Sequence, residues 1–504
     1  MAIQDTGYLG IDVGTSGTKG IMVNDVGDLL GEAEVGYDVA TPKPGWTEQS
    51  PEGWWSAVQS VCRDLVERFG APAAVGLTGQ MHGAVFLDAQ DEVIRPALLW
   101  NDQRTAAQAA EVEERVGSER LRAIAGNPAL TGFQAPKILW LRDNEPDLWA
   151  RVVRVLLPKD FIRLRLAGVS ATDASDAAGT LLLDLERRDW SDEILDALTI
   201  PRDWLPTVFE GPEVTGDVTA EAAAATGLAA GTPVVAGGGD NAAAAVANGA
   251  LASGDSIVSV GTSGVVFAPT DVPRPDPKGA IHAFCHAVPG LYHLMGVMLS
   301  AGGSLQWSAQ TLTGPDTKPD YEHLLREAAK VPPGSDGVFF LPYLAGERTP
   351  HMDPDARGTW VGMSLAHGRG HLIRAALEGV SYGLRDAFDR IETIGPTLNR
   401  PRLIGGGMRD PVWRQILVAV LGRECAFGGA GAEPATGAAI LAAVGSGRYQ
   451  DVAEAVAAMA PSAGDTITPD RDLADTYERR RAAFDALYPT VRDWQRLYIK
   501  GSNI

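Results

Sequence analysis

The sequence predicts an α/β protein of two domains, with the ligand site expected in the cleft between them. Its 504 residues exceed the size at which one hydrophobic core keeps growing. Short β-rich segments alternate with segments of helical periodicity, which is typical of mixed sheets covered by helices. The tetrapeptide Gly-Thr-Ser-Gly occurs at residues 14–17 and again at residues 261–264, each time between β-rich segments. Because the two contexts match, we infer an internal duplication.

The first half opens with predicted strands. Apolar and β-branched residues predict three strands, over residues 8–13, 18–23 and 29–35. Two tight turns, at residues 14–17 and 24–28, join them. Ser50 and Pro51 then favour a helix start, since serine is a good N-cap and proline suits the first helical position. A strand over residues 73–77 follows that helix. The expected order is three strands, a helix and a strand.

The second half repeats this opening and continues with longer helices. Strands over residues 256–260 and 265–268 flank the second Gly-Thr-Ser-Gly turn. Periodicity and capping residues then predict a helix, a short strand and three more helices, over residues 371–391, 402–404, 410–421, 434–444 and a charged segment after residue 470. Mixed sheets with helices on both faces are expected. We place the domains at residues 1–246 and 247–465, with a helical tail at residues 466–504.

Composition limits the classes of partner. The formal net charge of −21 argues against general affinity for nucleic acid or anionic membranes, although adaptation to high salt is an alternative source of this acidity. Cys62, Cys285 and Cys425 are few, distant and odd in number, which fits a reducing compartment. No signal-peptide pattern and no apolar run of about 18 residues is seen. We therefore expect a cytoplasmic protein with no nucleic-acid or membrane partner.

The two Gly-Thr-Ser-Gly turns are candidate phosphate sites. Small residues allow backbone N–H groups to approach phosphate oxygens, and the hydroxyls add donors. An ordinary hairpin turn is the alternative for either turn alone, but two turns on duplicated domains suit a polyphosphate held between them. Asp12, just before the first turn, is a candidate Mg²⁺ ligand, or else an acceptor for turn N–H groups. No Walker A pattern occurs. The phosphate-binding candidates are Gly14, Thr15, Ser16, Gly261, Thr262 and Ser263.

Asp240 is the candidate catalytic base. It follows three glycines, residues 237–239, and precedes Asn241 at a predicted strand-to-helix turn. Glycines allow close approach of a ligand to the backbone and place the carboxylate at the strand end. There the carboxylate is able to accept a proton from an attacking hydroxyl. A plain helix N-cap is the alternative.

A polar loop after the strand over residues 73–77 is a candidate sugar site. It carries Gln80, Met81 and His82 between two glycines, so that an amide, a thioether and an imidazole lie at a strand end. A structural histidine is the alternative for His82. A second polar cluster, residues 100–104, contains Trp100 and Asn101 and is expected to support the same pocket.

Three further patterns are weighed and set aside. The G-x-S-x-G match at residues 379–383 lies in a predicted helix, so it is rejected as a hydrolase nucleophile. Residues 137–142 are basic and aromatic, and are expected to form a helix surface. A histidine- and cysteine-containing segment is assigned to a hairpin, with zinc binding as a minor alternative, at His282, Cys285, His286 and His293.

With these motifs in place, the sequence resembles the FGGY family of carbohydrate kinases from Gly7 to about Gly447. One family signature is matched at every constrained position, namely Gly358, Trp360, Gly362, Met363, His371, Leu372, Ala375, Ala376, Leu377 and Glu378. The other signature, over residues 132–140, departs at Gln134, where proline, serine or threonine is usual. This departure leaves the site assignments unchanged.

The resemblance implies the fold shared by actin, hexokinase and the Hsp70 ATPase, in which two duplicated ribonuclease-H-like domains close on ATP. It implies that Asp240 is the catalytic base and that Asp12 serves Mg²⁺ and the phosphates. Gly406 and Gly407 resemble the adenosine-binding glycines, with Trp413 and Gln415 on the helix behind them. Lys19, in the strand after the first turn, is placed with the ATP-binding residues.

The resemblance also implies a substrate. Met81 and His82 resemble the substrate pair of family members that phosphorylate D-xylulose, and Gln80, Trp100, Asn101 and Asn241 are assigned to the same pocket. Glycerol is disfavoured, because charged residues are expected in that loop of glycerol-phosphorylating members. D-Ribulose, L-ribulose, a pentitol or gluconate are the nearest alternatives, followed by a sugar-independent ATPase and a silent sugar sensor. A homodimer is a family expectation.

Overall fold

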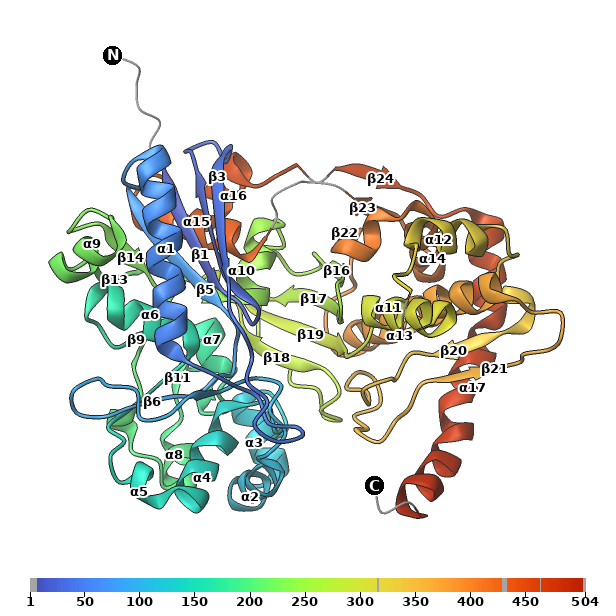
Figure 1. Cartoon of the computed structure of the whole chain (residues 1–504), viewed down its shortest axis with the longest axis horizontal. Coiled ribbons are helices and arrows are strands. Elements are labelled where there is room, and N and C mark those ends of the chain that lie inside the picture. Colours follow the sequence, from blue (N-terminus) through green and yellow to red (C-terminus); the bar gives the residue numbers. More distant parts are fainter. Residues whose placement is uncertain (1–6, 315–316, 428–432, 463, 502–504) are drawn as a thin grey trace.

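Each half of the chain builds one seven-stranded sheet. The computed structural model describes residues 7–314, 317–427, 433–462 and 464–501. The first half forms one lobe (blue to green in Figure 1), and most of the second half forms the other. The first sheet has the strand order β13-β14-β5-β1-β2-β3, with β15 also paired to β5. Its strands are β1 (Tyr8–Val13), β2 (Gly17–Val23), β3 (Leu29–Gly36), β5 (Ala74–Gly79), β13 (Val214–Asp217), β14 (Pro233–Val235) and β15 (Gly238–Gly239).

The second sheet repeats the first. Its order is β18-β19-β17-β16-β22-β23-β24, so that β19-β17-β16-β22-β23-β24 corresponds to β3-β2-β1-β5-β14-β13. In the first sheet β1, β2 and β3 are antiparallel neighbours, and β5 and β14 run parallel to β1. In the second sheet β16, β17 and β19 are antiparallel neighbours, and β22 and β23 run parallel to β16. The predicted duplication and α/β class are confirmed. The strands are β16 (Ile257–Val260), β17 (Gly264–Thr270), β18 (His282–Cys285), β19 (Tyr292–Met298), β22 (Arg402–Ile404), β23 (Cys425–Phe427) and β24 (Asp465–Ile467).

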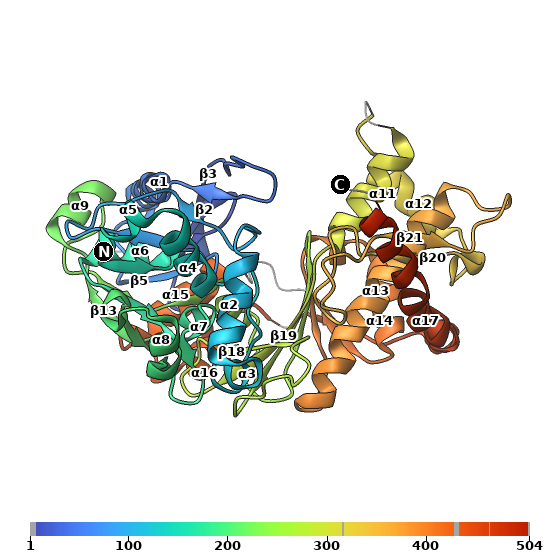
Figure 2. The ribbon, with the colours of Figure 1, turned by 90° about the horizontal axis from the view of Figure 1, so that it is seen from below.

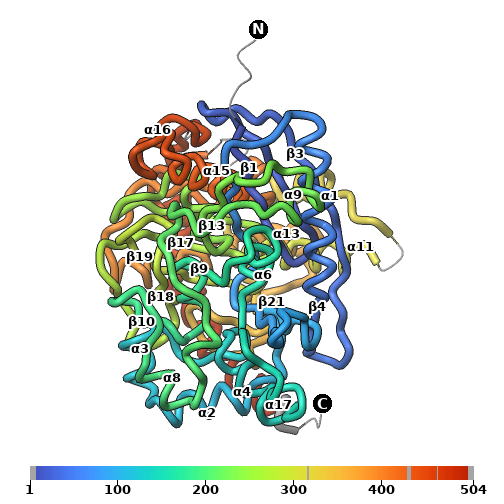
Figure 3. Tube along the Cα trace, turned by 90° about the vertical axis from the view of Figure 1, so that its left-hand side faces the viewer, coloured from blue at the N-terminus to red at the C-terminus, as the bar shows by residue number. Residues whose placement is uncertain are grey.

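Helices cover both faces of the first sheet because its strands alternate between two cores. Leu9, Ile11 and Val13 of β1 point to one side, where they pack with Trp54 and Val58 of α1 (Pro51–Phe69). The opposite face, which includes Tyr8 and Ile21, packs against α15 (Pro434–Gly445) and α16 (Val452–Met459). Figure 3 shows α15 and α16 beside β1 although they come from the far end of the sequence.

Helix α15 packs on the sheet of the other half. Helix α10 (Asp240–Ala247) packs mainly on α15 and on strands β5 and β15, and it places Ala245 in a small core with Ile257 and Phe267 of the second sheet. The helices and strands approach at glycines. A Cβ atom at Gly76 would lie 1.9 Å from the carbonyl oxygen of Ala438, and one at Gly437 would lie 1.8 Å from that of Ala243. The contact between the lobes therefore requires these glycines.

Further elements extend each lobe. Between β5 and β13 the first lobe carries β6 (Val85–Leu87), β7 (Ala97–Leu98), α2 (Ala106–Val116), α3 (Ser118–Ala125), α4 (Gln134–Asn144), α5 (Pro146–Trp149), β8 (Arg154–Leu156), α6 (Pro158–Ala167), β9 (Ala171–Asp173), α7 (Ala174–Ala178), β10 (Leu183–Asp184), β11 (Asp189–Trp190), α8 (Asp192–Leu198) and β12 (Thr207–Phe209); β4 (Glu48–Gln49) precedes α1, and α9 (Ala220–Thr226) follows β13. The second lobe adds α11 (Gly302–Thr313), α12 (Tyr321–Ala329), β20 (Phe339–Leu341), β21 (Thr359–Val361), α13 (Arg369–Ile394), α14 (Pro411–Leu421) and α17 (Arg471–Gly501). In the described residues, no helix has both the length and the hydropathy to cross a bilayer.

Most predicted elements are found within one to three residues of their expected ends, and the G-x-S-x-G match does lie inside helix α13. One prediction is wrong. Residues 137–140 do not form a helix surface, because Lys137 is fully buried and Trp140 is only 5% exposed. Helix α4 is buried from Gln134 to Leu141, and its low amphipathicity hid this from the sequence.

Candidate active site

The candidate residues collect at the carboxyl ends of parallel strands in both sheets. In the first sheet, β1 ends before the turn at residues 14–17, β5 ends before Gln80, and β15 ends before Asp240. In the second sheet, β16 and β22 are parallel neighbours. Strand β16 ends before the turn that begins at Gly261, and β22 ends before the glycines that begin at Gly405. Ligands of α/β sheets bind at such edges. Figure 2 shows the two lobes from below, with β18 and β19 between the first lobe and α13.

One cavity of about 270 Å³ joins the two lobes at these strand ends. Seven of the predicted site residues line it, together with five residues that the sequence did not indicate. The first group is Met81, His82, Trp100, Asp240, Asn241, Gly261 and Ser263, and the second is Ser259, Val265, Met295, Val297 and Arg348. The cavity thus combines apolar walls with a few polar groups, as small-molecule sites usually do.

Asp240 begins helix α10 and faces the cavity. Its Oδ1 accepts hydrogen bonds from the backbone N–H of Asn241 at 2.7 Å and from the side-chain amide of Asn241 at 2.8 Å. Burial raises the pKa of Asp240 to about 6, and the bonds from Asn241 act in the opposite direction. Near neutral pH the carboxylate is therefore mainly ionised, yet basic enough to accept a proton.

Asp12 lies near Asp240 in the first sheet, one residue before the end of β1. Its Oδ1 is buried and has no hydrogen-bond partner among the described residues. Burial, together with the negative charges of Asp240 and Glu433, raises its pKa to about 7. A buried carboxylate oxygen without a donor, beside other carboxylates, suits a divalent cation with oxygen ligands such as Mg²⁺.

The loop after β5 holds His82 in a fixed orientation. His82 has a left-handed backbone (φ 66°), and its Nδ1 lies 2.6 Å from the carbonyl oxygen of Gly179. Burial lowers the pKa of His82 to about 3, so the ring is neutral and Nδ1–H donates to that carbonyl. Nε2 is then an acceptor for a ligand hydroxyl. The neighbouring Met81 is 5% exposed and lines the cavity.

Two residues predicted to bind substrate do not line the cavity. The side-chain amide of Gln80 donates to the carbonyl oxygen of Gly14 (3.2 Å) and to Gln49 (3.0 Å). Asn101 accepts a bond from the hydroxyl of Thr47 (2.8 Å). Trp100 does line the cavity, and its indole N–H donates to Thr15 (3.0 Å). These contacts tie the first Gly-Thr-Ser-Gly turn to the sugar loop.

The remaining candidates for ATP binding lie at the strand ends around the cavity. The second turn accepts bonds from the start of α11, through Gly302 N–H to Gly261 O at 2.7 Å and Gly303 N–H to Thr262 O at 3.0 Å. Gly406 is exposed, and a Cβ there would meet nothing within 4 Å. Lys19 pairs with Glu32 (2.9 Å) and with Glu433 (2.6 Å), so its ammonium group is neutralised within the protein.

Two cationic residues of the site were missed by sequence reasoning. The Nζ of Lys137 donates to His82 O at 2.8 Å and makes a short bond to Gly132 O, and burial lowers its pKa to about 7. Arg348 reaches the same region from the second lobe. The only available signal for Lys137 was its place in the second family signature, and Arg348 had none.

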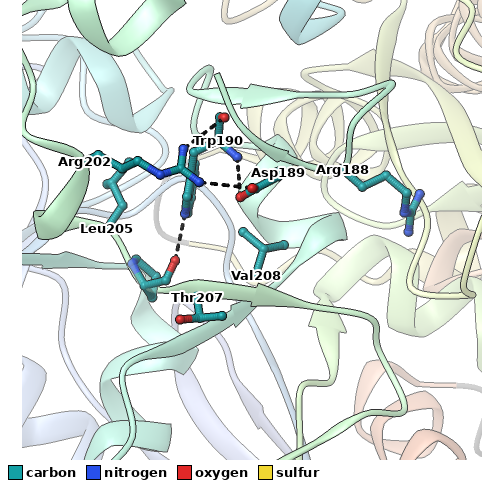
Figure 4. A pocket seen from close by; sticks show the side chains of 8 residues that line it. Arg188, Asp189, Trp190, Arg202, Leu205, Thr207 and Val208 are labelled. Atoms are coloured by element: carbon teal, nitrogen blue, oxygen red, sulfur yellow. Dashed lines mark hydrogen bonds and ion pairs between the residues drawn. The ribbon is translucent and has the colours of Figure 1, made fainter. Parts of the chain in front are cut away.

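A second hollow lies away from this site. It has a volume of about 390 Å³ and is lined by residues 188–190, 202 and 205–208 (Figure 4). Its polar groups mainly satisfy one another: Arg202 pairs with Asp189 at 3.0 Å, and the indole N–H of Trp190 donates to Pro206 O at 2.7 Å. None of the predicted site residues lies there.

Two family models match the chain. Residues 7–247 match the N-terminal domain of the FGGY family of carbohydrate kinases, and residues 257–446 match its C-terminal domain. The xylulose kinase of Escherichia coli (strain K12) is 43% identical over 484 residues, covering 95% of this chain and 98% of that protein. The gluconokinase of Bacillus subtilis (strain 168) is 30% identical over 509 residues, covering 97% and 98%.

The fold is shared with solved structures. The crystal structure of xylulose kinase from Rhodospirillum rubrum superimposes with a TM-score of 0.90 at 32% sequence identity, and the match covers 97% of this chain and 100% of that one. The two-lobed arrangement is therefore one that sugar kinases adopt.

Proposed function

The chain belongs to the FGGY family of carbohydrate kinases, and on this premise we propose that it phosphorylates D-xylulose with ATP to give D-xylulose 5-phosphate. The observation that carries the proposal is the cavity that Asp240 lines together with Met81, His82 and the second Gly-Thr-Ser-Gly turn. Trp100, which also lines it, bonds to Thr15 of the first turn. The relative that is 43% identical to this chain is named a xylulose kinase, which supports D-xylulose over the other sugars that the family phosphorylates.

The first lobe supplies the acceptor side of the reaction. Met81 and Trp100 offer apolar surface to the carbon chain of the sugar, and Nε2 of His82 accepts a hydrogen bond from a hydroxyl. Asp240 accepts the proton of the attacking terminal hydroxyl as the oxygen of that hydroxyl bonds to the γ-phosphorus. The bond between the γ-phosphorus and the β,γ-bridging oxygen breaks, and ADP is the leaving group. Since phosphoryl transfer is largely dissociative, orientation of this hydroxyl contributes more than early deprotonation.

The strand-end turns supply the nucleotide side. The turns at residues 14–17 and 261–264 offer backbone N–H groups and hydroxyls to phosphate oxygens, and the open space at Gly406 leaves room for adenosine. Gly407 packs against Val260 and Trp413 and supports this loop. Asp12 would hold Mg²⁺, which supplies charge neutralisation on the phosphates. Closure of the lobes excludes water, which would otherwise compete for the phosphoryl group. The family premise also favours a cytoplasmic homodimer, which this mechanism does not require.

The experiment is a coupled ADP-release assay against D-xylulose, D-ribulose, L-ribulose, pentitols, glycerol and gluconate, with and without Mg²⁺. We expect D-xylulose to have the highest kcat/KM by tenfold or more, about 1.4 kcal/mol of transition-state preference. A different preferred sugar would keep the kinase assignment of the family and refute the acceptor. ADP release that is indifferent to every sugar would favour the ATPase alternative.

A further inference from the structure

Arg348 is a charged side chain of the cavity that the mechanism above leaves unused. It follows β20 in the second lobe and lines the cavity together with Asp240 and His82. Its guanidinium makes neither an ion pair nor a hydrogen bond with any residue in the described part of the chain. Burial lowers its pKa from the ordinary value, but arginine remains charged in proteins. A partly buried cation without an acceptor is costly.

The backbone around Arg348 is fixed on both sides. Glu347 accepts bonds from the N–H groups of Leu299 (3.0 Å) and of Arg348 itself (2.8 Å). Thr349 exchanges bonds with Val297 at the end of β19, through backbone N–H to Val297 O (3.0 Å) and through its hydroxyl, which accepts from Val297 N–H (3.1 Å). The free guanidinium is therefore not explained by a loosely held loop.

The guanidinium lies beside the first lobe, at the sugar loop. A Cβ atom at Gly132 would lie 3.5 Å from a terminal nitrogen of Arg348. The carbonyl oxygens of Gly132 and His82 already accept bonds from Lys137. Lys137 thus lies in the same region and uses these two carbonyl oxygens. The Arg348 guanidinium forms no hydrogen bond or ion pair of its own within the described residues.

This end of the cavity is distinct from the reacting end. The charge of Asp240 contributes to the raised pKa of Asp12, whereas Arg348 forms no ion pair with Asp240 although both line the same cavity. A guanidinium close to an ionised carboxylate would form such a pair. Arg348 therefore faces the part of a bound molecule that is remote from the transferred phosphoryl group.

We propose that Arg348 is a substrate-binding and specificity-determining residue, contributed by the second lobe, which donates hydrogen bonds to the carbonyl and hydroxyl oxygens at the C1–C2 end of the ketose. This proposal rests on the proposed function for the identity of the sugar. An open-chain ketose supplies the missing acceptors at the end away from the hydroxyl that attacks. Because Arg348 and His82 come from different lobes, the sugar is held from both sides.

The test is Arg348→Met, which removes the donors and keeps most of the side-chain volume. We expect the KM for D-xylulose to rise tenfold or more, the KM for ATP to change less than twofold, and sugar-independent ATP hydrolysis to persist. Arg348→Lys should recover part of the loss, because one charge and donor remain without the planar fork. Arg357→Met is the matched control in the same segment, since the Arg357 guanidinium donates to the carbonyl oxygens of Pro354 and Ala356.

Two further measurements separate binding from folding. Removing an unpaired cation should leave the Tm of the free protein unchanged or higher, whereas the rise in Tm produced by a fixed concentration of D-xylulose should be smaller than in wild type. The penalty of Arg348→Met should also shrink at least threefold with 1-deoxy-D-xylulose, which lacks the hydroxyl at C1. A lower Tm with unchanged KM would make Arg348 structural and overturn the proposal, as would a penalty on ATP instead of sugar.

Failure of the role of Arg348 and failure of the D-xylulose assignment give different results. If the wild-type enzyme prefers another sugar, that sugar replaces D-xylulose in the same measurements, and an unchanged KM in Arg348→Met would still refute the role of Arg348. If wild type prefers D-xylulose and Arg348→Met matches it, only the present inference is wrong.

Discussion

At the scale of single residues, burial sets the chemistry of the site. Asp240 and Asp12 both have raised pKa values because their carboxylates are removed from water, and His82 has a lowered one for the same reason. The result is a basic carboxylate, a carboxylate suited to a cation and a neutral imidazole within one site. Perturbed groups of this kind, gathered in one cavity, are typical of active sites.

Replacing the base should separate binding from chemistry. We expect Asp240→Asn to bind D-xylulose with a Kd within a few-fold of wild type, because the amide keeps the shape of the carboxylate. Its kcat should fall by about 10²–10⁴-fold, the usual contribution of general acid–base catalysis. Calorimetric binding and steady-state kinetics measure the two quantities. Turnover close to wild type would remove Asp240 from the mechanism, and Asp217→Asn, at an exposed strand residue, is the control.

The pKa of Asp240 should appear in the pH profile. Because the ionised form is active and the pKa is raised to about 6, kcat/KM should fall as the pH drops through about 6, and not near the ordinary value of about 4. Asn241→Ala removes the side-chain donor to Asp240 and should move this midpoint upward. A midpoint that moves downward in this variant would contradict the assigned hydrogen bond.

At the scale of elements, two helices and a few glycines join the lobes. Helix α15 lies on the first sheet so closely that Gly76 has no room for a side chain. Helix α10 packs on α15 and places Ala245 in a small core of the second sheet. These helices cross each other at Gly437 and Ala243. Each lobe therefore depends on a helix from the other half for part of its core.

A methyl group at Gly76, where β5 meets α15, should lower the stability of the protein. Gly76→Ala would place Cβ 1.9 Å from Ala438 O, and we expect about 2–3 kcal/mol of destabilisation or more, the upper part of the range for overpacking. Gly53→Ala is the control, because its Cβ would meet only Ser50 Cβ at 3.8 Å in the first turn of α1. Denaturant or thermal unfolding measures both. Equal stability of the two variants would show that α15 shifts away from the strand at little cost.

At the scale of the whole molecule, duplication explains where the site lies. Two sheets of the same order place the carboxyl ends of their parallel strands around one cavity. The second Gly-Thr-Ser-Gly turn lines this cavity, and the first is bonded to the lining residue Trp100. The groups expected to bind the sugar come mainly from the first lobe, whereas Arg348, Met295 and Val297 come from the second. A ligand that contacts both lobes favours their closure, which is the conformational step expected of this kinase family.

The sequence by itself determined the α/β class, the duplication, most strands and helices, and the core of the site around Asp12, Met81, His82 and Asp240. These features are local: apolar periodicity, capping residues, glycine-bounded turns and signature motifs lie within short segments of the chain. Asp240 stood out because three glycines precede it, and His82 because glycines flank its loop.

Only the tertiary structure decided the burial of Lys137, the packing of α15 on the first sheet, and the approach of Arg348 to the sugar loop. It also decided that Gln80 and Asn101 bond to other protein groups and do not line the cavity. The physical reason is distance along the chain. A lysine that bonds to two carbonyl oxygens, or an arginine more than 200 residues from the loop it faces, has no local pattern that marks its partner, because long-range packing alone brings them together.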